Sequence, residues 1–230
     1  MDFEPDDRFI VVVGHARISL PHRMSTVRRT ALVTLSALCL GLAGCGPKAP
    51  NLDSPGKTIV CLGDSITAGV GAAPGPAYPD LLAARLGKEV INAGVPGDTA
   101  EQGLARVDDV LAADPWLVIV ELGGNDFLQQ VPPERTEAAL RSILRRLLAA
   151  RVVPVLVEFR VPFGSKYGEI YGRLAKERKV PIVEDTLHDI LLDPALKSDD
   201  IHPNAQGYER LAAAVAHEVE PLIKARRRRR

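Results

Sequence analysis

The chain has little of three things on which many folds and functions depend: cysteine, aromatic side chains and excess charge. It has only three cysteines in 230 residues, so we expect no disulfide framework. Aromatic residues make up 4%, too few for a platform that stacks on single-stranded nucleic acid. The formal net charge is +0, so the protein as a whole has no electrostatic attraction to nucleic acid. The remaining composition, 46% hydrophobic and 25% charged, is that of an ordinary globular protein.

Motifs that hold metals or phosphates are also missing. The zinc-binding spacings C-x-x-C and H-E-x-x-H do not occur. The segment from Gly69 to Gly75 is rich in glycine but has no G-K-[ST], which disfavours a P-loop. The run Gly63-x-Ser65-x-Thr67 lacks the second glycine of the G-x-S-x-G elbow, which disfavours the α/β-hydrolase fold. We therefore expect neither a metal nor another cofactor.

The first 45 residues differ in character from the rest of the chain. Residues 1–23 contain several acidic residues and a short β-like run at 10–13, and we interpret them as a non-native or disordered extension. Met24 then opens a new pattern, with Arg28 and Arg29 followed by an apolar run over 31–43. That run is too short to span a membrane, which takes about 20 residues. The pattern is typical of a secretory signal peptide, so we expect Met24 to be the true start.

The end of this signal carries a cysteine. The residues Leu42-Ala-Gly-Cys45 resemble the lipobox of bacterial lipoproteins. The resemblance implies a signal over 24–45, cleavage before Cys45 and lipidation of its sulfur. The protein would then be lipid-anchored on the periplasmic face of a bacterial membrane. The alternative is an apolar helix with a chance cysteine. Residues 46–56, rich in proline and glycine, are predicted to be a flexible linker.

From residue 57 to 225, predicted strands and helices alternate. Short apolar runs are typical of strands buried on both faces, and apolar stripes at helical spacing predict the helices. The alternation predicts an α/β fold: a three-layer α/β/α sandwich with a five-stranded parallel sheet, flavodoxin-like in type. The expected strands are 58–62, 89–92, 116–121, 152–158 and 181–183, and the expected helices are 78–86, 100–112, 133–150, 166–179 and 205–224.

The chain ends in five arginines, residues 226–230. A run of one charge usually forms a solvated tail, which is the interpretation we prefer. Attraction to anionic lipid is the alternative. For the protein as a whole we expect a monomer that does not bind nucleic acid.

Polar residues follow several of the predicted strands, at the edge of a parallel sheet where ligands bind. Among them is Ser65, and a serine becomes nucleophilic only when a base removes its proton. His202 is the best candidate for that base, and Asp199 can reach its ring from three residues upstream. Asp200 is the alternative carboxylate, ranked second because adjacent side chains point apart. The sequence therefore predicts an acyl-transfer site with Ser65, His202 and Asp199.

Acyl transfer also needs hydrogen-bond donors around the oxyanion that forms on the substrate. Asn125 offers a side-chain amide after a predicted strand, and Gly94 offers a backbone N–H with no side chain in the way. The N–H of Ser65, at the start of a helix, is a third donor that the helix dipole favours. We expect Ser65, Gly94 and Asn125 to form the oxyanion hole.

Four blocks together resemble the SGNH (GDSL) hydrolase family. The resemblance implies that Ser65 is the nucleophile, Gly94 and Asn125 are oxyanion donors, and His202 is the base, with Asp199 as third triad member. The blocks are Gly63-Asp-Ser-Ile-Thr67, Asn92-Ala-Gly-Val-Pro-Gly-Asp-Thr99, Gly123-Gly-Asn-Asp126 and Asp199-Asp-Ile-His-Pro203.

Three runs are similar to the bacterial thioesterase I, lysophospholipase and arylesterase branch of that family: Gly97 to Arg106, Val120 to Asp126 and Arg160-Val-Pro162. That similarity implies hydrolysis of small-molecule or lipid acyl esters and thioesters through an acyl-enzyme. Three alternatives stay open: a carbohydrate acetyl esterase on the same fold, a non-catalytic binding lipoprotein, and a flavodoxin-like binder of phosphate or nucleotide.

Overall fold

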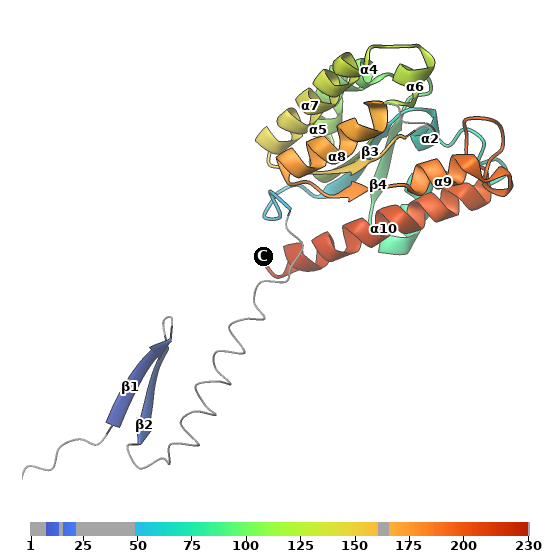
Figure 1. Ribbon diagram of the computed structural model, residues 1–230. Helices are drawn as coiled ribbons and strands as arrows, with labels where there is room; N and C mark the ends of the chain where they lie inside the picture. Colours follow the sequence, from blue (N-terminus) through green and yellow to red (C-terminus); the bar gives the residue numbers. More distant parts are fainter. Residues whose placement is uncertain (1–7, 14–15, 22–48, 161–165, 230) are drawn as a thin grey trace, which may run out of the picture. The chain divides into compact units, whose positions relative to one another are not determined.

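The computed structural model describes residues 8–13, 16–21, 49–160 and 166–229 (Figure 1). The predicted signal peptide at 24–45, with its lipidation site Cys45, lies outside these ranges. In them, no helix has both the length and the apolar character needed to cross a membrane. The chain divides into two compact units, residues 1–46 and residues 47–230.

The described part of the first unit is a two-stranded antiparallel hairpin. Its strands are β1 (Arg8–Val13) and β2 (Ala16–Pro21). The β-like run predicted at 10–13 falls within β1. Whether residues 1–23 belong to the natural protein stays a prediction.

The second unit is built on a five-stranded sheet in the order β4-β3-β5-β6-β7, with all neighbouring strands parallel. Numbered along this unit the order is 2-1-3-4-5, which is the flavodoxin-like arrangement. The prediction of a five-stranded parallel sheet is thus confirmed. The strands are β3 (Thr58–Gly63), β4 (Val90–Gly94), β5 (Pro115–Glu121), β6 (Val153–Val157) and β7 (Ile182–Val183).

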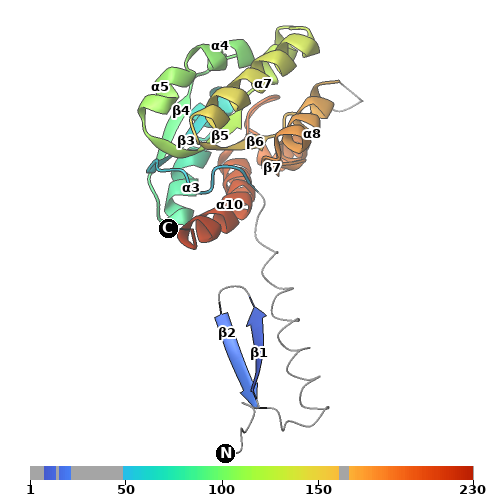
Figure 2. The ribbon, with the colours of Figure 1, turned by 90° about the vertical axis from the view of Figure 1, so that its left-hand side faces the viewer.

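Helices cover both faces of this sheet, which gives the predicted three layers (Figure 2). One face carries α4 (Ala100–Ala105), α5 (Val107–Ala112), α7 (Pro133–Ala149) and α8 (Lys166–Arg178). The other carries α3 (Tyr78–Leu86) and α10 (Ala205–Arg227), which pack against each other. The helix predicted over 100–112 is interrupted at Arg106, which ends α4 and precedes α5.

Four short elements were not predicted, and three of them carry residues of the candidate site described below. They are α2 (Ser65–Ala68), α6 (Gly124–Leu128), α9 (Thr186–Leu192) and the 3-10 helix η2 (Pro194–Leu196).

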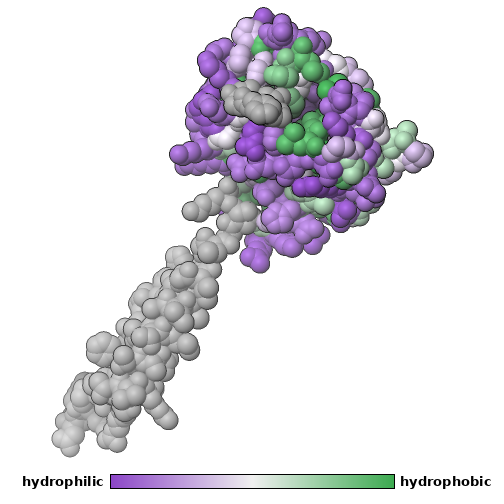
Figure 3. Space-filling view, turned by 45° about the vertical axis from the view of Figure 1, so that its right-hand side comes forward, coloured by the Kyte–Doolittle hydropathy of each residue, from purple (hydrophilic) through white to green (hydrophobic). Residues whose placement is uncertain are grey.

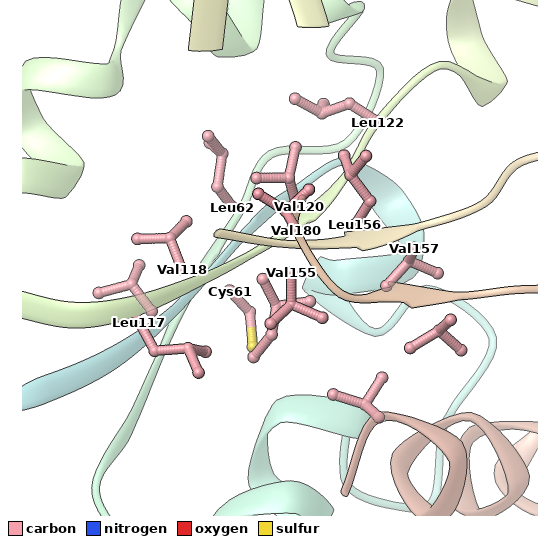
Figure 4. Packing of buried hydrophobic residues seen from close by; sticks show 14 of the residues in the cluster. Cys61, Leu62, Leu117, Val118, Val120, Leu122, Val155, Leu156, Val157 and Val180 are labelled. Atoms are coloured by element: carbon pink, nitrogen blue, oxygen red, sulfur yellow. The ribbon is translucent and has the colours of Figure 1, made fainter. Parts of the chain in front are cut away.

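The hydrophobic core lies on both sides of the central strands. Every residue of β5 and of β6 is buried, and Figure 4 shows side chains of these strands packed with those of β3. Cys61 on β3 is a free, fully buried thiol, and burial raises its pKa to about 12. A thiol held in its neutral form is a poor nucleophile, so Cys61 acts as a core residue.

Both ends of this unit are more ordered than the sequence predicts. The side-chain amide of Asn51 donates hydrogen bonds to the carbonyls of Leu148 (3.0 Å) and Val152 (3.1 Å), and Leu52 is fully buried. The flexible linker predicted over 46–56 is therefore too long, because residues 51–56 belong to the folded unit. Only one leucine and one asparagine attach this segment to the domain. Two single residues within a polar stretch give no pattern from which the contact could be predicted.

The C-terminal prediction needs a similar correction. Helix α10 continues through Arg227, and the Arg226 guanidinium lies 4.5 Å from the centre of the Trp116 ring. Arg226 also donates a hydrogen bond to the Ser54 carbonyl at 3.1 Å. The first two of the five terminal arginines are thus helical. Residues 47–230 contain the whole sheet and core, so this unit can fold without residues 1–46.

Candidate active site

Ser65 stands in a tight turn between β3 and α2. Asp64 caps α2, because its Oδ1 accepts a hydrogen bond from the Ile66 N–H at 3.0 Å. A Cβ at Gly63 would lie 1.9 Å from Thr67 Oγ1 and 2.6 Å from the Glu121 carbonyl oxygen. Glycine is therefore required where the turn closes against β5, and the turn holds Ser65 at the carboxyl end of the sheet.

The strand register brings two further segments to the same place. Gly63 pairs with Gly94 at the end of β4 and with Glu121 at the end of β5. The three strands thus end level with one another. The segments that follow them hold Ser65 at the start of α2, residues 95–99 in a loop, and Asn125 in α6.

His202 joins Ser65 to Asp199. Its Nε2 lies 3.0 Å from Ser65 Oγ, and its Nδ1 lies 2.8 Å from Asp199 Oδ2. With the ring proton on Nδ1, His202 donates to the carboxylate and accepts from the serine hydroxyl. Hydrogen bonds from the N–H of Ile201 and from the main chain and ring of His202 hold the pKa of Asp199 below its usual range. The carboxylate therefore stays charged and fixes the tautomer.

The loop that carries this pair is held at both ends. Lys197 and Pro203 form an isolated antiparallel bridge across it. Asn204 caps α10 through hydrogen bonds from the Gln206 and Gly207 N–H groups, and its own amide donates to the Ala195 carbonyl at 2.8 Å. Asp200, the alternative carboxylate, points into solvent, and its nearest charged partner is Lys197 at 4.0 Å. The structure therefore favours Asp199.

The prediction that the Gly94 N–H is an oxyanion donor is wrong. Its N–H already donates to Asn92 Oδ1 at 2.9 Å. Its Cα faces the back of α2, where a Cβ would lie 2.2 Å from the Ala68 nitrogen. Gly94 is thus a close-packing position that lets β4 approach α2, and it has no free donor for a substrate.

Gly97, three residues later, has the properties expected of that donor. It has φ +89°, a conformation that favours glycine, and a Cβ there would meet open space. Within the described residues, the N–H groups of Gly97 and of Ser65 make no hydrogen bond. The carbonyl of the next residue, Asp98, accepts from Asn125 Nδ2 at 3.0 Å. The turn Gly97-Asp-Thr99 that precedes a helix is the sequence signal that could have found it.

The side-chain amide of Asn125 already makes two hydrogen bonds in the protein without substrate. Its Nδ2 donates to Asp64 Oδ2 at 3.1 Å as well as to the Asp98 carbonyl. Both amide hydrogens are therefore in use, and an oxyanion would share one of them or displace an acceptor. Hydrogen bonds of this kind often reach their final geometry only when substrate is bound.

Arg106 ties these loops together, a role that the sequence did not reveal. Its Nε lies 2.6 Å from Asp98 Oδ2. Its two terminal nitrogens donate to the carbonyls of Ala93 (2.7 Å) and Gly63 (2.9 Å). One planar guanidinium thus joins the ends of β3 and β4 to the loop that carries Gly97, a geometry that lysine could not reproduce.

Comparison with known proteins now gives the family. The profile of the GDSL-like Lipase/Acylhydrolase family matches residues 61–210. The chain is 39% identical over 176 residues to "Thioesterase 1/protease 1/lysophospholipase L1" of Escherichia coli K12, covering 72% of this chain and 85% of that protein. It is 32% identical to "Esterase TesA" of Pseudomonas aeruginosa, covering 73% of this chain and 90% of that protein. The chain belongs to the GDSL-like lipase/acylhydrolase family.

Solved structures agree with this assignment. A crystal structure of TesA superposes with a TM-score of 0.67 at 32% identity, covering 72% of this chain and 99% of that one. AlinE4, described as an SGNH-hydrolase family esterase, superposes with a TM-score of 0.57 at 36% identity, covering 72% and 95%. The protein is therefore a carboxylic-ester hydrolase of the SGNH type.

Beside Ser65, this SGNH hydrolase has a cavity of about 240 Å³. Four apolar side chains that line it are also well exposed, Phe127, Leu128, Leu192 and Ile201. Figure 3, which brings the α2 side of the molecule forward, shows hydrophobic surface gathered on this face. The sequence analysis did not predict these residues, because the short helices α6 and α9 and the loop before His202 that carry them show no periodic pattern. In the described part of the chain, no cluster of histidine, cysteine or acidic residues could hold a metal.

A pair of buried acids lies under the serine turn. Asp64 and Glu121 are both 2% exposed, and Glu121 accepts a hydrogen bond from Thr67 Oγ1 at 2.8 Å. Burial raises the pKa of Asp64 to about 6. Burial, and then the nearby charge of Asp64, raise the pKa of Glu121 well above its usual value. Burial thus favours the neutral, protonated form of Glu121, the form that fits beside another carboxyl group.

Glu121→Gln should flatten the pH dependence of stability. The folded protein holds the Glu121 and Asp64 protons to higher pH than the unfolded chain, whose carboxyl pKa values are about 4. Wild-type stability should therefore fall as pH rises from about 4 through about 6 and beyond. Glutamine has the shape of the neutral acid but no proton to release. The Glu121→Gln variant should therefore lose less stability than the wild type as pH rises. Urea unfolding at several pH values measures this. Glu209→Gln, at an exposed position of α10, is the control. Equal slopes for Glu121→Gln and wild type would contradict the assignment.

Proposed function

We propose that the protein hydrolyses acyl esters and thioesters through an acyl-enzyme on Ser65, with His202 as general base and Asp199 as its orienting carboxylate. The observation that carries this proposal is the hydrogen-bonded chain from Asp199 through His202 to Ser65 Oγ, at the mouth of an apolar cavity. The names of the relatives, which include a thioesterase, a lysophospholipase and an arylesterase, support the same substrate class.

In the first half of the reaction, Ser65 Oγ attacks the acyl carbonyl while His202 Nε2 takes its proton. The charged Asp199 stabilises the imidazolium that results. Negative charge develops on the carbonyl oxygen, and we assign its donors as the N–H groups of Ser65 and Gly97 and the amide of Asn125. His202 then passes its proton to the leaving alcohol or thiol, and the C–O or C–S bond breaks.

In the second half, water enters the place of the leaving group. His202 Nε2 takes a proton from it, and the hydroxide oxygen attacks the acyl carbon. The same donors stabilise the second oxyanion. Its collapse breaks the bond to Ser65 Oγ, which regains the proton from His202, and the acid leaves.

The lining of the cavity favours an acyl chain over a sugar. Phe127, Leu128 and Leu192 present apolar surface beside the serine, and Phe127 is fixed by an edge-on contact with Tyr167 at 5.7 Å between ring centres. Apolar groups gain free energy when they leave water for such a surface, whereas sugar hydroxyls need hydrogen-bond partners. A carbohydrate acetyl esterase is therefore the less favoured alternative.

Ser65→Ala should lower kcat by several orders of magnitude, because the nucleophile of a triad cannot be replaced by its neighbours. The assay uses residues 47–230 with p-nitrophenyl acetate, butyrate and octanoate and with palmitoyl-CoA. We expect the wild type to prefer butyrate or longer chains to acetate. Ser142→Ala, on α7, is the control and should stay active. An active Ser65→Ala variant would refute the nucleophile, and a strict preference for acetyl sugars would favour the alternative.

Asn125→Ala should reduce kcat by roughly 100- to 1000-fold, the cost of losing one oxyanion donor in other hydrolases. The same change leaves Asp64 Oδ2 and the Asp98 carbonyl without one hydrogen bond each. Thermal unfolding of the variant must therefore accompany the kinetics. A folded variant with wild-type turnover would remove Asn125 from the site.

We also propose that Cys45 is lipidated and holds the enzyme on the periplasmic face of a bacterial membrane. The basic residues, apolar run and Leu42-Ala-Gly-Cys45 of the sequence support this location. The full chain expressed in a Gram-negative host should fractionate with membranes. The Cys45→Ser variant should be depleted from the membrane fraction, and its mass should lack the acyl groups. A wild-type protein without acyl groups would contradict the proposal.

A further inference from the structure

A cluster of cations lies at the amino end of the sheet. Lys57, Lys88, Arg226 and Arg227 line a hollow there together with Trp116 and Ile223. Arg228 and Arg229 follow directly at the end of α10, and both are exposed. We call Lys57, Lys88 and Arg226–Arg229 the basic pole.

Five of the six cations of the basic pole lack a carboxylate partner in the described residues. Lys57, Lys88, Arg227, Arg228 and Arg229 are exposed, and none forms an ion pair with a carboxylate in the part of the chain that the structure describes.

Several arginines elsewhere on this unit are paired, since Arg141, Arg146 and Arg173 each form an ion pair with an acidic side chain. Because the whole chain has a formal net charge of +0, the positive field of the pole is a local feature.

The position of the basic pole is fixed by the fold. Arg226 lies over Trp116, which is 2% exposed, and donates to the carbonyl of Ser54, so the end of α10 is attached to β5 and to the segment before β3. Lys57 immediately precedes β3, and Lys88 lies between α3 and β4. The cations therefore surround one rigid end of the sheet, whatever the conformation of the last residues.

The basic pole and the active site lie at opposite ends of the same strands. β3 runs from Thr58, next to Lys57, to Gly63, next to the Ser65 turn. Its six residues span about 20 Å at about 3.3 Å per residue. Figure 1 shows the end of α10 and helix α2 at opposite ends of this unit. A flat surface that meets the pole would leave the cavity beside Ser65 open to water.

We propose that the basic pole docks on an anionic lipid bilayer and holds the active site facing away from it. Exposed point charges suit a surface of anionic lipid headgroups. Nucleic acid is a poorer partner, because Trp116 is covered by Arg226 and cannot stack on a base. The chain upstream joins the domain at this same end. A lipid on Cys45 would be separated from Asn51 by six residues, at most about 20 Å of chain. The docking does not require that lipid, and it does not depend on the proposed reaction.

The test uses residues 47–230 and vesicles of phosphatidylcholine with or without phosphatidylglycerol. Co-sedimentation measures binding, and Trp116, the only tryptophan of the chain, reports it by energy transfer to a dansyl lipid. We expect binding only to the anionic vesicles, and weaker binding as salt rises. Equal binding to both kinds of vesicle would overturn the proposal, and so would tighter binding to an oligonucleotide at the same salt.

The triple variant Lys88→Gln, Arg227→Gln, Arg228→Gln should bind anionic vesicles roughly 100-fold more weakly, since each cation near such a surface contributes roughly five-fold. Arg145→Gln, Lys166→Gln, Lys176→Gln removes the same charge from exposed positions elsewhere and is the matched control. Equal losses in both variants would show that net charge alone governs binding and would refute a specific pole.

The orientation has its own readout. Bound wild-type enzyme should cleave soluble p-nitrophenyl butyrate at the rate of the free enzyme, because the cavity faces water. Loss of this activity on anionic vesicles, reversed by the triple variant, would show that the site faces the bilayer and would refute the orientation. If the protein proves inactive on every ester, vesicle binding still tests the pole separately from the proposed reaction.

Discussion

The pairing of β3 with β4 and β5 is the constraint on which the site depends. Gly63 lies between Gly94 and Glu121 in one row of the sheet, so three chains leave the sheet at the same level. Parallel pairing makes this row possible, because the carboxyl ends of all strands then lie at one edge. A shift of one residue would turn Glu121 to the other face and separate the Ser65 turn from Asn125.

Polar groups buried behind that row keep it in place. Arg106 joins the carbonyls of Gly63 and Ala93 to Asp98, while Asn125 joins Asp98 to Asp64. These contacts are partly shielded from bulk water, and in such surroundings a hydrogen bond is stronger and an unpaired group costs more. The loops are therefore rigid before substrate arrives. Rigid donors are what the stabilisation of an oxyanion requires, because they need no reorganisation during the reaction.

The sequence predicts the regular parts of this structure well and the irregular parts poorly. The long amphipathic helices and buried strands follow from periodicity, as α3 shows, which has the predicted bounds of 78–86. The short helices α2, α6 and α9 have too few turns to show a period, yet they carry Ser65, Phe127 and Leu192. The candidate site was predicted from side-chain chemistry, and Ser65, His202 and Asp199 form a hydrogen-bonded chain in the structure.

Backbone donors are harder to predict than side chains. Gly94 and Gly97 look alike in sequence, and only the structure separates them, through the hydrogen bond from Gly94 to Asn92, the positive φ of Gly97 and the space around each Cα. The ends of the domain were misjudged for a related reason. Asn51 and Arg226 make their decisive contacts with residues about a hundred or more positions away, and composition contains no record of such contacts.

Covalent trapping of the nucleophile tests the central claim most directly. Residues 47–230 would be incubated with a fluorophosphonate and digested, and the modified peptide identified by mass spectrometry. The account predicts one adduct, on Ser65 Oγ, and much slower labelling when His202→Ala removes the base. An adduct on another residue, or labelling of Ser65 at the same rate without His202, would contradict it.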